Sequence, residues 1–300
     1  MKSIVSYPDR GSYGRNTYRG NCSGKLIEDI IEQYKLKSLS DFMVGSGTTE
    51  DVIKAKHLTG DFADLNRGYD MMNMDIPNRA DNIFWHPPYH DMVIYSGKQY
   101  SDEEIIKKYG FDPKSNDLSR CASWQEFIQK LNYCMLKQFA ALEKGGRMFV
   151  LMGDMKRKGR LFSMLTDIAK PGQLEQIIIK TQHNCWSDTQ SYSNHNFVPI
   201  IHEYLMIVKK ESNLYIPVSY NVKKELDIRD SQTASWRDIL FAILEDNGGE
   251  MNLAELYAKM EGRKKTTNNN HWKEKIRQTL QNRRYFISNS RGHFQAKVNK

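Results

Sequence analysis

The stretch that most constrains the fold is a short apolar run that ends in two consecutive prolines. It reads Asp81-Asn82-Ile83-Phe84-Trp85-His86-Pro87-Pro88-Tyr89. The apolar part predicts a buried strand, and the prolines must end it, because proline donates no sheet hydrogen bond and restricts the residue before it. His86 and Tyr89 therefore flank a rigid turn. In α/β sheets that edge binds ligands, although an ordinary strand-to-loop exit has the same pattern.

Strand-like and helix-like patterns alternate over the first two-thirds of the chain. Helices are expected at about 25–34, 50–58, 102–108, 123–145 and 160–169, and strands at 38–44, 60–63, 83–85, 147–152, 175–180 and 202–209. The polar stretch at 95–122 is expected to be an excursion over the active face, and residues 181–199 are expected to form a polar, aromatic loop. This alternation predicts an α/β fold with a doubly wound, mostly parallel sheet.

A glycine-rich turn, residues 45–49 (Gly-Ser-Gly-Thr-Thr), joins an expected strand to an expected helix. Such a turn lets the backbone approach a ligand closely and points free helix N–H groups at it. The turn lacks the third glycine of a dinucleotide fingerprint and the Gly-Lys-Ser/Thr ending of a phosphate loop, so neither NAD nor ATP is favoured. Asp64 ends the next expected strand, where a carboxylate can hold ribose hydroxyls. Asp75, further along, is a candidate for holding an adenine amino group.

Basic residues concentrate near the C-terminal end of the sequence. Residues 261–300 carry eleven Lys or Arg against two Asp or Glu, a net charge of +9, whereas the whole chain carries +8. Residues 1–260 are therefore close to neutral. A solvated charged face is the ordinary reading of a basic run, but this one lies beside aromatic residues and favours contact with a polyanion.

The pattern changes beyond an expected linker at 213–234. Residues 235–300 predict three short helices and a basic hairpin, which together make a winged helix whose third helix would be offered to a DNA groove. The candidate DNA-binding residues are the basic side chains of this region: Lys264, Lys265, Lys273, Lys275, Arg277, Arg283, Arg284 and Arg291.

Size and cysteine content restrict the class of protein further. Three hundred residues suffice for one large α/β domain and a small module. No apolar run is long enough to cross a bilayer and no stretch resembles a signal peptide, so a cytoplasmic location is expected. The four cysteines form no Cys-x-x-Cys pair and predict neither a zinc site nor a disulfide framework. They are Cys22, Cys121, Cys134 and Cys185.

Two motifs together resemble those of the S-adenosylmethionine-dependent DNA amino-methyltransferases, which modify N6 of adenine or N4 of cytosine. Residues 41–49 are similar to that family's cofactor loop, which usually reads Asp-Pro-Phe-x-Gly-Ser-Gly-Thr-Thr. Residues 86–89 resemble its catalytic Asp/Asn/Ser-Pro-Pro-Tyr. Later framework segments at 142–146 and 202–210 are also similar, and the resemblance covers about residues 15–210.

The resemblance implies a Rossmann-like methyltransferase domain over residues 1–212, with S-adenosylmethionine as cofactor. It implies double-stranded DNA as partner, with a restriction endonuclease as a further candidate and no metal or membrane. The implied catalytic residues are His86, Pro87, Pro88 and Tyr89. The implied cofactor-binding residues are Arg19, Asn21, Cys22, Ser23, Asp41, Gly45, Gly47, Thr48, Asp64 and Asp75. The target base would leave the stack and stack on Tyr89, while His86 and the Pro87 carbonyl accept hydrogen bonds from its amine.

His86 departs from the family pattern, which has Asp, Asn or Ser at this position. A neutral imidazole can accept a hydrogen bond through one nitrogen, whereas a protonated one cannot. The departure leaves both bases open, with N6 of adenine favoured over N4 of cytosine. It also supports the alternative of a weak or inactive methyltransferase-like DNA-binding protein or accessory subunit. Two further alternatives are an RNA substrate on the same fold and a nucleotide-binding domain of unrelated chemistry.

Overall fold

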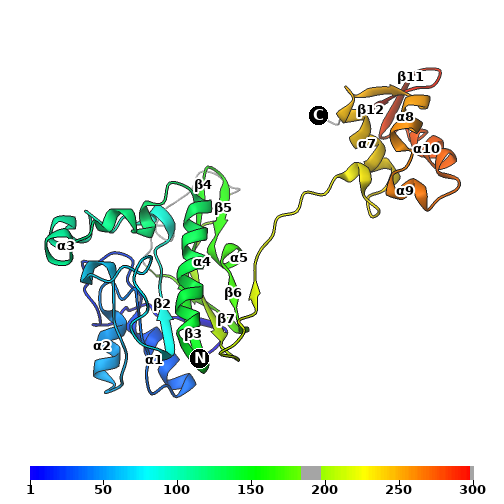
Figure 1. Ribbon diagram of the computed structural model, residues 1–300. Helices are drawn as coiled ribbons and strands as arrows, with labels where there is room; N and C mark the ends of the chain where they lie inside the picture. The colour runs from blue at the N-terminus through cyan, green and yellow to red at the C-terminus, as the bar shows by residue number, and fades with distance from the viewer. Residues whose placement is uncertain (184–196, 298–300) are drawn as a thin grey trace. The chain divides into compact units, whose positions relative to one another are not determined.

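The computed structural model describes residues 1–183 and 197–297 (Figure 1). The chain divides into two compact units, Met1–Asn221 and Val222–Lys300. The division falls inside the segment that the sequence predicts to be a linker. Among the described residues, no helix has the length and apolar character needed to cross a membrane.

The first unit is built on a five-stranded sheet with the order β1-β7-β8-β3-β2. Its strands are β1 (Ile4–Ser6), β2 (Ala80–Trp85), β3 (Leu142–Met152), β7 (Gln173–Thr181) and β8 (His202–Lys209). β1 pairs in parallel with β7, and β2 in parallel with β3, whereas β8 is antiparallel to both of its neighbours. β8 alone therefore runs against the other four, and the expectation of a mostly parallel sheet is confirmed.

Two extended segments continue this sheet beyond β2. The Ser40 amide donates to the Asn82 carbonyl at 3.0 Å, and the Asp41 amide donates to the Asp61 carbonyl at 2.9 Å. Both segments make parallel bridges. The strands expected at 38–44 and 60–63 are thus short bridged segments, because the chain turns at once into the glycine-rich loop, where the Met43 amide already bonds to the Asp41 side chain.

Helices cover both faces of the sheet. They are α1 (Gly24–Tyr34), α2 (Thr48–Ala55), α3 (Asp102–Tyr109), α4 (Trp124–Ala140) and α5 (Met164–Asp167), with short 3-10 turns at η1 (Leu65–Arg67), η2 (His90–Met92), η3 (Pro113–Ser115) and η4 (Leu118–Arg120). Ile83 and Trp85 of β2 pack in one core with α4, while Phe84 packs in the other core with α1 and α2. The alternation along β2 is that of a strand buried on both faces.

Two sequence-based boundaries in this unit are wrong. The helix expected at 160–169 is a hairpin of β4 (Asp154–Arg157) and β5 (Arg160–Ser163), followed by only the four residues of α5. Its two-residue loop, Lys158 and Gly159, has φ values of 48° and 75°, the positive values that a type I′ turn requires. The helix expected to reach residue 145 ends at Ala140, and Gly146 lies in β3, where a Cβ would come within 2.3 Å of the Asp81 carbonyl.

The second unit has its own core of helices packed on a three-stranded antiparallel sheet, β10-β12-β11. Its elements are η5 (Ile228–Asp230), α7 (Trp236–Asp246), β10 (Glu250–Asn252), α8 (Leu253–Met260), α9 (Lys264–Thr267), α10 (Trp272–Leu280), β11 (Phe286–Ser290) and β12 (His293–Ala296). The first unit has one more strand pair, β6 (Lys170–Pro171) with β9 (Val218–Ser219). Capping boxes begin α7 and α8, as the residues Ser235 and Asn252 predict.

Candidate functional site

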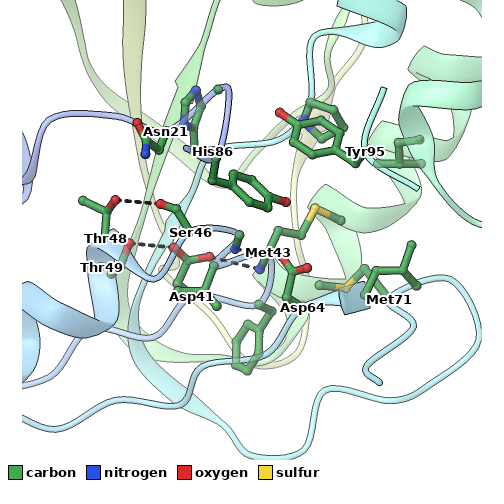
Figure 2. Close-up of a pocket in the computed structure, with 18 of the residues that line it drawn as sticks. Asn21, Asp41, Met43, Ser46, Thr48, Thr49, Asp64, Met71, His86 and Tyr95 are labelled. Atoms are coloured by element: carbon green, nitrogen blue, oxygen red, sulfur yellow. Dashed lines mark hydrogen bonds between the residues drawn. The ribbon is translucent and has the colours of Figure 1, made fainter. Parts of the chain in front are cut away.

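A cleft of about 820 Å³ opens at the edge of the sheet where β2 ends (Figure 2). Four parts of the chain line most of it: the N-terminal arm before α1, the segment from Asp41 to Thr49, the segment from Asp64 to Met71, and the excursion between β2 and α4. The sequence predicts a ligand site at this edge. We call this cleft the first pocket.

Asp64 holds the glycine-rich loop in place. One of its carboxylate oxygens accepts a hydrogen bond from the Gly45 amide at 2.8 Å and the other accepts from the Asn66 amide at 3.0 Å. Gly45 has a φ of 49°, and a Cβ there would meet the Tyr18 ring at 3.1 Å, so glycine suits this position. Burial raises the pKa of Asp64, and the two amide hydrogen bonds oppose that rise. Each oxygen keeps a second lone pair with which it can accept from a ligand hydroxyl.

Asp41 also holds the glycine-rich loop in place, and it is only 3% exposed. Its carboxylate accepts hydrogen bonds from the Thr49 hydroxyl at 2.6 Å and from the Met43 amide at 3.0 Å, as the dashed lines in Figure 2 show. Burial raises the pKa of Asp41 to about 7. Both oxygens thus serve the loop, so Asp41 shapes the pocket.

The charged residues that line the first pocket are all acidic. Asp41, Asp64 and Asp117 line it, and no Lys or Arg among the described residues does. Asp117 is itself fixed by the Ser96 and Ser119 amides, at 2.8 and 2.9 Å. Such a pocket disfavours a di- or triphosphate and suits a ligand that is neutral or carries positive charge.

A second pocket of about 1140 Å³ adjoins the first. It is lined by the start of the chain, the turn after β2, the end of β7 and the beginning of β8. The two pockets share five lining residues: Gly20, Asn21, Cys22, His86 and Tyr95. His86 therefore stands where the two hollows meet.

A buried polar chain runs along the wall of the second pocket. The Tyr89 hydroxyl donates to Glu203 Oε1 at 2.7 Å and lies 3.0 Å from His86 Nε2. Lys180 Nζ donates to the other oxygen, Glu203 Oε2, at 2.7 Å. Lys180 and Glu203 face each other across the antiparallel β7 and β8, so the register of these strands creates the ion pair.

The ionisation of this chain follows from its surroundings. Burial lowers the pKa of His86, and the negative charge of Glu203 only partly offsets this. Burial alone would raise the pKa of Glu203, but the charge of Lys180, the neighbouring His86 and two hydrogen bonds bring it below its ordinary value. Burial, together with Glu203, raises the pKa of Tyr89. At neutral pH the chain therefore contains a neutral imidazole, a neutral phenol and a carboxylate.

Most residues implied by the motifs line one pocket or both. The first pocket has Asn21, Cys22, Asp41, Gly45, Thr48, Asp64, His86 and Pro88, and the second has Asn21, Cys22, Ser23, His86, Pro87 and Tyr89. Three residues line neither pocket. The Arg19 side chain is exposed, Gly47 caps the start of α2, and Asp75 is exposed on a turn.

Several pocket residues have no counterpart in the predicted set. Tyr18, Tyr95 and Asp117 come from the arm and the excursion, and Lys180 and Glu203 from β7 and β8. Lys180 and Glu203 could have been suspected from the sequence, because each is a charged residue in an otherwise largely apolar strand. Most of the loop expected at 181–199, together with Cys185, lies outside the described residues.

Basic side chains of the second unit are mostly exposed. Seven of the eight candidates are exposed, namely Lys264, Lys273, Lys275, Arg277, Arg283, Arg284 and Arg291. Lys265 is the exception, since it is half-buried and donates to the Ala234 carbonyl. Over the described ranges, no three His, Cys, Asp or Glu side chains are grouped to hold a metal, and Cys22, Cys121 and Cys134 are free and buried.

Comparison with known proteins gives limited information. No protein-family model and no curated protein matches the chain. Among solved structures, it is similar to a candidate DNA modification methylase from Thermus thermophilus at 14% identity and a TM-score of 0.28, covering 63% of this chain and 57% of that one. A protein from echinomycin biosynthesis has 10% identity, a TM-score of 0.29, and coverages of 68% and 84%. TrmN from Thermus thermophilus has 12% identity, a TM-score of 0.26, and coverages of 64% and 50%. These scores are too low to add to the geometry.

Proposed function

We propose that this protein is an S-adenosylmethionine-dependent methyltransferase that modifies the exocyclic amine of a base in DNA, N6 of adenine ahead of N4 of cytosine. One observation carries the proposal. Two pockets of different charge meet at His86, a hydrogen-bond acceptor next to two prolines. A donor held in one pocket and an acceptor base in the other would face each other at that junction.

The first pocket fits S-adenosylmethionine by its donors and its charge. Asp64 has free lone pairs for ribose hydroxyls, and Gly45 gives the backbone clearance for a close approach. The carboxylates and the lack of Lys or Arg on the described walls favour a cofactor that carries positive charge and no phosphate. When bound, this cofactor would supply a methyl group on a sulfonium: the C–S bond breaks with its electron pair left on sulfur, an N–C bond forms, and the proton lost by the amine passes to water.

In the second pocket, the chain's own residues would position the amine. His86 and the Pro87 carbonyl each offer one acceptor to the two N–H groups, which leaves the nitrogen lone pair directed at the first pocket. The Tyr89 ring is part of the wall on which the base would stack. Burial keeps His86 neutral at physiological pH, so the acceptor is present. Most of the rate would come from holding the reacting atoms in line.

The second unit supports DNA as the substrate. Its order of a helix, a strand, three helices and a two-stranded hairpin supports the proposal of a winged helix, and its exposed Lys and Arg side chains would neutralise phosphates. Flipping the base out of the duplex would then bring it to the second pocket. We therefore propose that the second unit is a winged helix that binds DNA.

The test is transfer of a labelled methyl group from S-adenosylmethionine to duplex DNA by the wild type and by His86→Ala and Tyr89→Ala. His57→Asn, an exposed histidine outside both pockets, and Tyr133→Ala, an exposed tyrosine of α4, are the matched controls. Both pocket variants should lose most of the activity while still binding the cofactor in calorimetry. Wild-type rates in both would remove these residues from the mechanism, and DNA binding without any transfer in the wild type would favour an accessory protein.

A further inference from the structure

Glu203 lies on the wall of the second pocket, in the framework segment 202–210 and outside the two motifs that carry the implied site residues. It is joined to His86 through the Tyr89 hydroxyl, and its Oε1 lies 3.9 Å from His86 Nε2. We propose that Glu203 is a positioning residue: through Tyr89 it fixes the proton of neutral His86 on Nε2, so that Nδ1 is the bare nitrogen that accepts the hydrogen bond of the amine. The role of Nδ1 rests on the proposed function, but the position of the proton does not.

The count of protons in the chain supports this assignment. A phenol has one proton to donate, and the Tyr89 hydroxyl lies 2.7 Å from Glu203 Oε1, which as a carboxylate oxygen can only accept. With its proton directed at Glu203, the hydroxyl can bond to His86 Nε2 at 3.0 Å only as an acceptor. Nε2 must then carry the proton, and in a neutral ring Nδ1 carries none.

The assignment requires Glu203 to be ionised, and its surroundings ensure this. Lys180 Nζ lies 2.7 Å from Glu203 Oε2, and the two side chains are only 10% and 8% exposed. Unpairing such buried charges is costly, so Glu203 and Lys180 keep each other charged. With Oε2 occupied by the ammonium, Oε1 is the oxygen left for Tyr89.

Nδ1 of His86 is in the right place to act on a ligand. No residue in the described ranges, 1–183 and 197–297, makes a hydrogen bond to it, while Nε2 is engaged with Tyr89. The His86 side chain is 14% exposed and lines both pockets, beside Asn21 in Figure 2. Nδ1 is accessible from the pockets and, as a bare nitrogen, can accept a hydrogen bond from a ligand N–H.

The neighbouring Lys180 makes one substitution unusually informative. In Glu203→Gln, the ammonium requires an acceptor, so the amide oxygen must face Lys180 and the amide NH₂ must face Tyr89. The Tyr89 hydroxyl then accepts from the amide and donates to His86 Nε2. The proton of His86 moves to Nδ1, and the nitrogen that faced the substrate becomes a donor.

The experiment is long-range ¹H–¹⁵N NMR of the full chain labelled with ¹⁵N-histidine, with the His86 signals identified by their loss in His86→Asn. The wild type should show the tautomer protonated on Nε2, and Glu203→Gln the one protonated on Nδ1. Glu175→Gln is the matched control, because Glu175 pairs with Arg147 on the same sheet but lines neither pocket. It should leave the tautomer unchanged. A wild-type ring protonated on Nδ1, or a Glu203→Gln spectrum identical to the wild type, would overturn the proposal.

Kinetics separates this proposal from the proposed function. Glu203→Gln should reduce kcat for methyl transfer by about 10²-fold, the usual effect of misorienting one polar group at a reacting centre, and should leave the KM for S-adenosylmethionine within about twofold. An unchanged kcat would contradict a positioning role even if the tautomer reverses. If the wild type transfers no methyl group but shows the tautomer protonated on Nε2, the function fails and the relay from Glu203 stands.

Discussion

The two pockets share an edge of the sheet and a histidine, yet they are built in opposite ways. The first pocket is shaped by the glycine-rich loop, which two carboxylates hold in place. Asp41 accepts hydrogen bonds from the Met43 amide and the Thr49 hydroxyl, and Asp64 accepts one from the Gly45 amide. The second depends on Lys180 and Glu203, which meet only through strand register. A local motif thus specifies the first pocket, and tertiary structure specifies the second.

The difference in charge carries the functional argument. The first pocket has carboxylates without a cation on its described walls, whereas the second has Arg10, a neutral imidazole and the Lys180–Glu203 ion pair. A cationic donor fits the former and an uncharged heterocycle fits the latter. The shared histidine, the carboxylates of the first pocket and the basic side chains of the second unit can each be changed separately.

Replacing the shared histidine should have the largest effect. His86→Ala removes the acceptor of the amine, and the rate of methyl transfer should fall by about 10²- to 10³-fold, as for other oriented polar groups at a reacting centre. Cofactor affinity should change by less than about threefold, because the first pocket keeps its carboxylates. Single-turnover transfer and calorimetry measure the two quantities. A loss of cofactor binding equal to the loss of rate would show that the two pockets are not separate.

The first pocket is tested by Asp64→Ala. The Gly45 amide loses its acceptor and the ribose would lose its own, so the affinity for S-adenosylmethionine should fall by about 10- to 100-fold, which corresponds to the roughly 1.5–3 kcal/mol of hydrogen bonds to a charged group. Asp75→Ala is the control, because Asp75 is exposed and lines neither pocket. Equal losses in the two variants, measured by calorimetry, would refute the assignment of Asp64.

The pH dependence should report on the second pocket. Burial lowers the pKa of His86 below its ordinary value of about 6.5. The transfer rate should therefore stay level as the pH falls through 6.5 and then decline about tenfold per unit as Nδ1 is protonated. Asp41, whose pKa is about 7, titrates in both the wild type and His86→Asn, so the difference between their profiles isolates His86. A decline that begins above pH 6.5 only in the wild type would be contrary to a buried, neutral histidine.

The smallest effect is expected from the second unit. Lys273→Ala with Arg283→Ala removes two phosphate contacts, so the slope of log affinity for duplex DNA against log salt should become shallower by about 1.8. Lys37→Ala with Lys144→Ala is the matched control, because it removes the same charge from exposed positions of the first unit. Fluorescence anisotropy over a range of salt concentrations compares the two pairs. An equal change in both would mean that only net charge matters.

The same contrast explains what the sequence could predict. Helix α1, β3 and β8 follow from local apolar periodicity, and the glycine-rich turn from its residues. The hairpin at 154–163 was missed because Lys158-Gly159 is a weak turn signal inside an amphipathic pattern. The pairing of Lys180 with Glu203 could not be predicted, since it depends on the register between two strands that are not adjacent in the sequence.

The most direct test of the account is a single-turnover reaction of the wild type with methyl-labelled S-adenosylmethionine and duplex DNA, followed by digestion to nucleosides. The account predicts that the label is found on an exocyclic amine, as N6-methyladenine or, second, N4-methylcytosine, and that His86→Ala gives far less over the same reaction time. Saturating cofactor and DNA binding with no label on any exocyclic amine would contradict it.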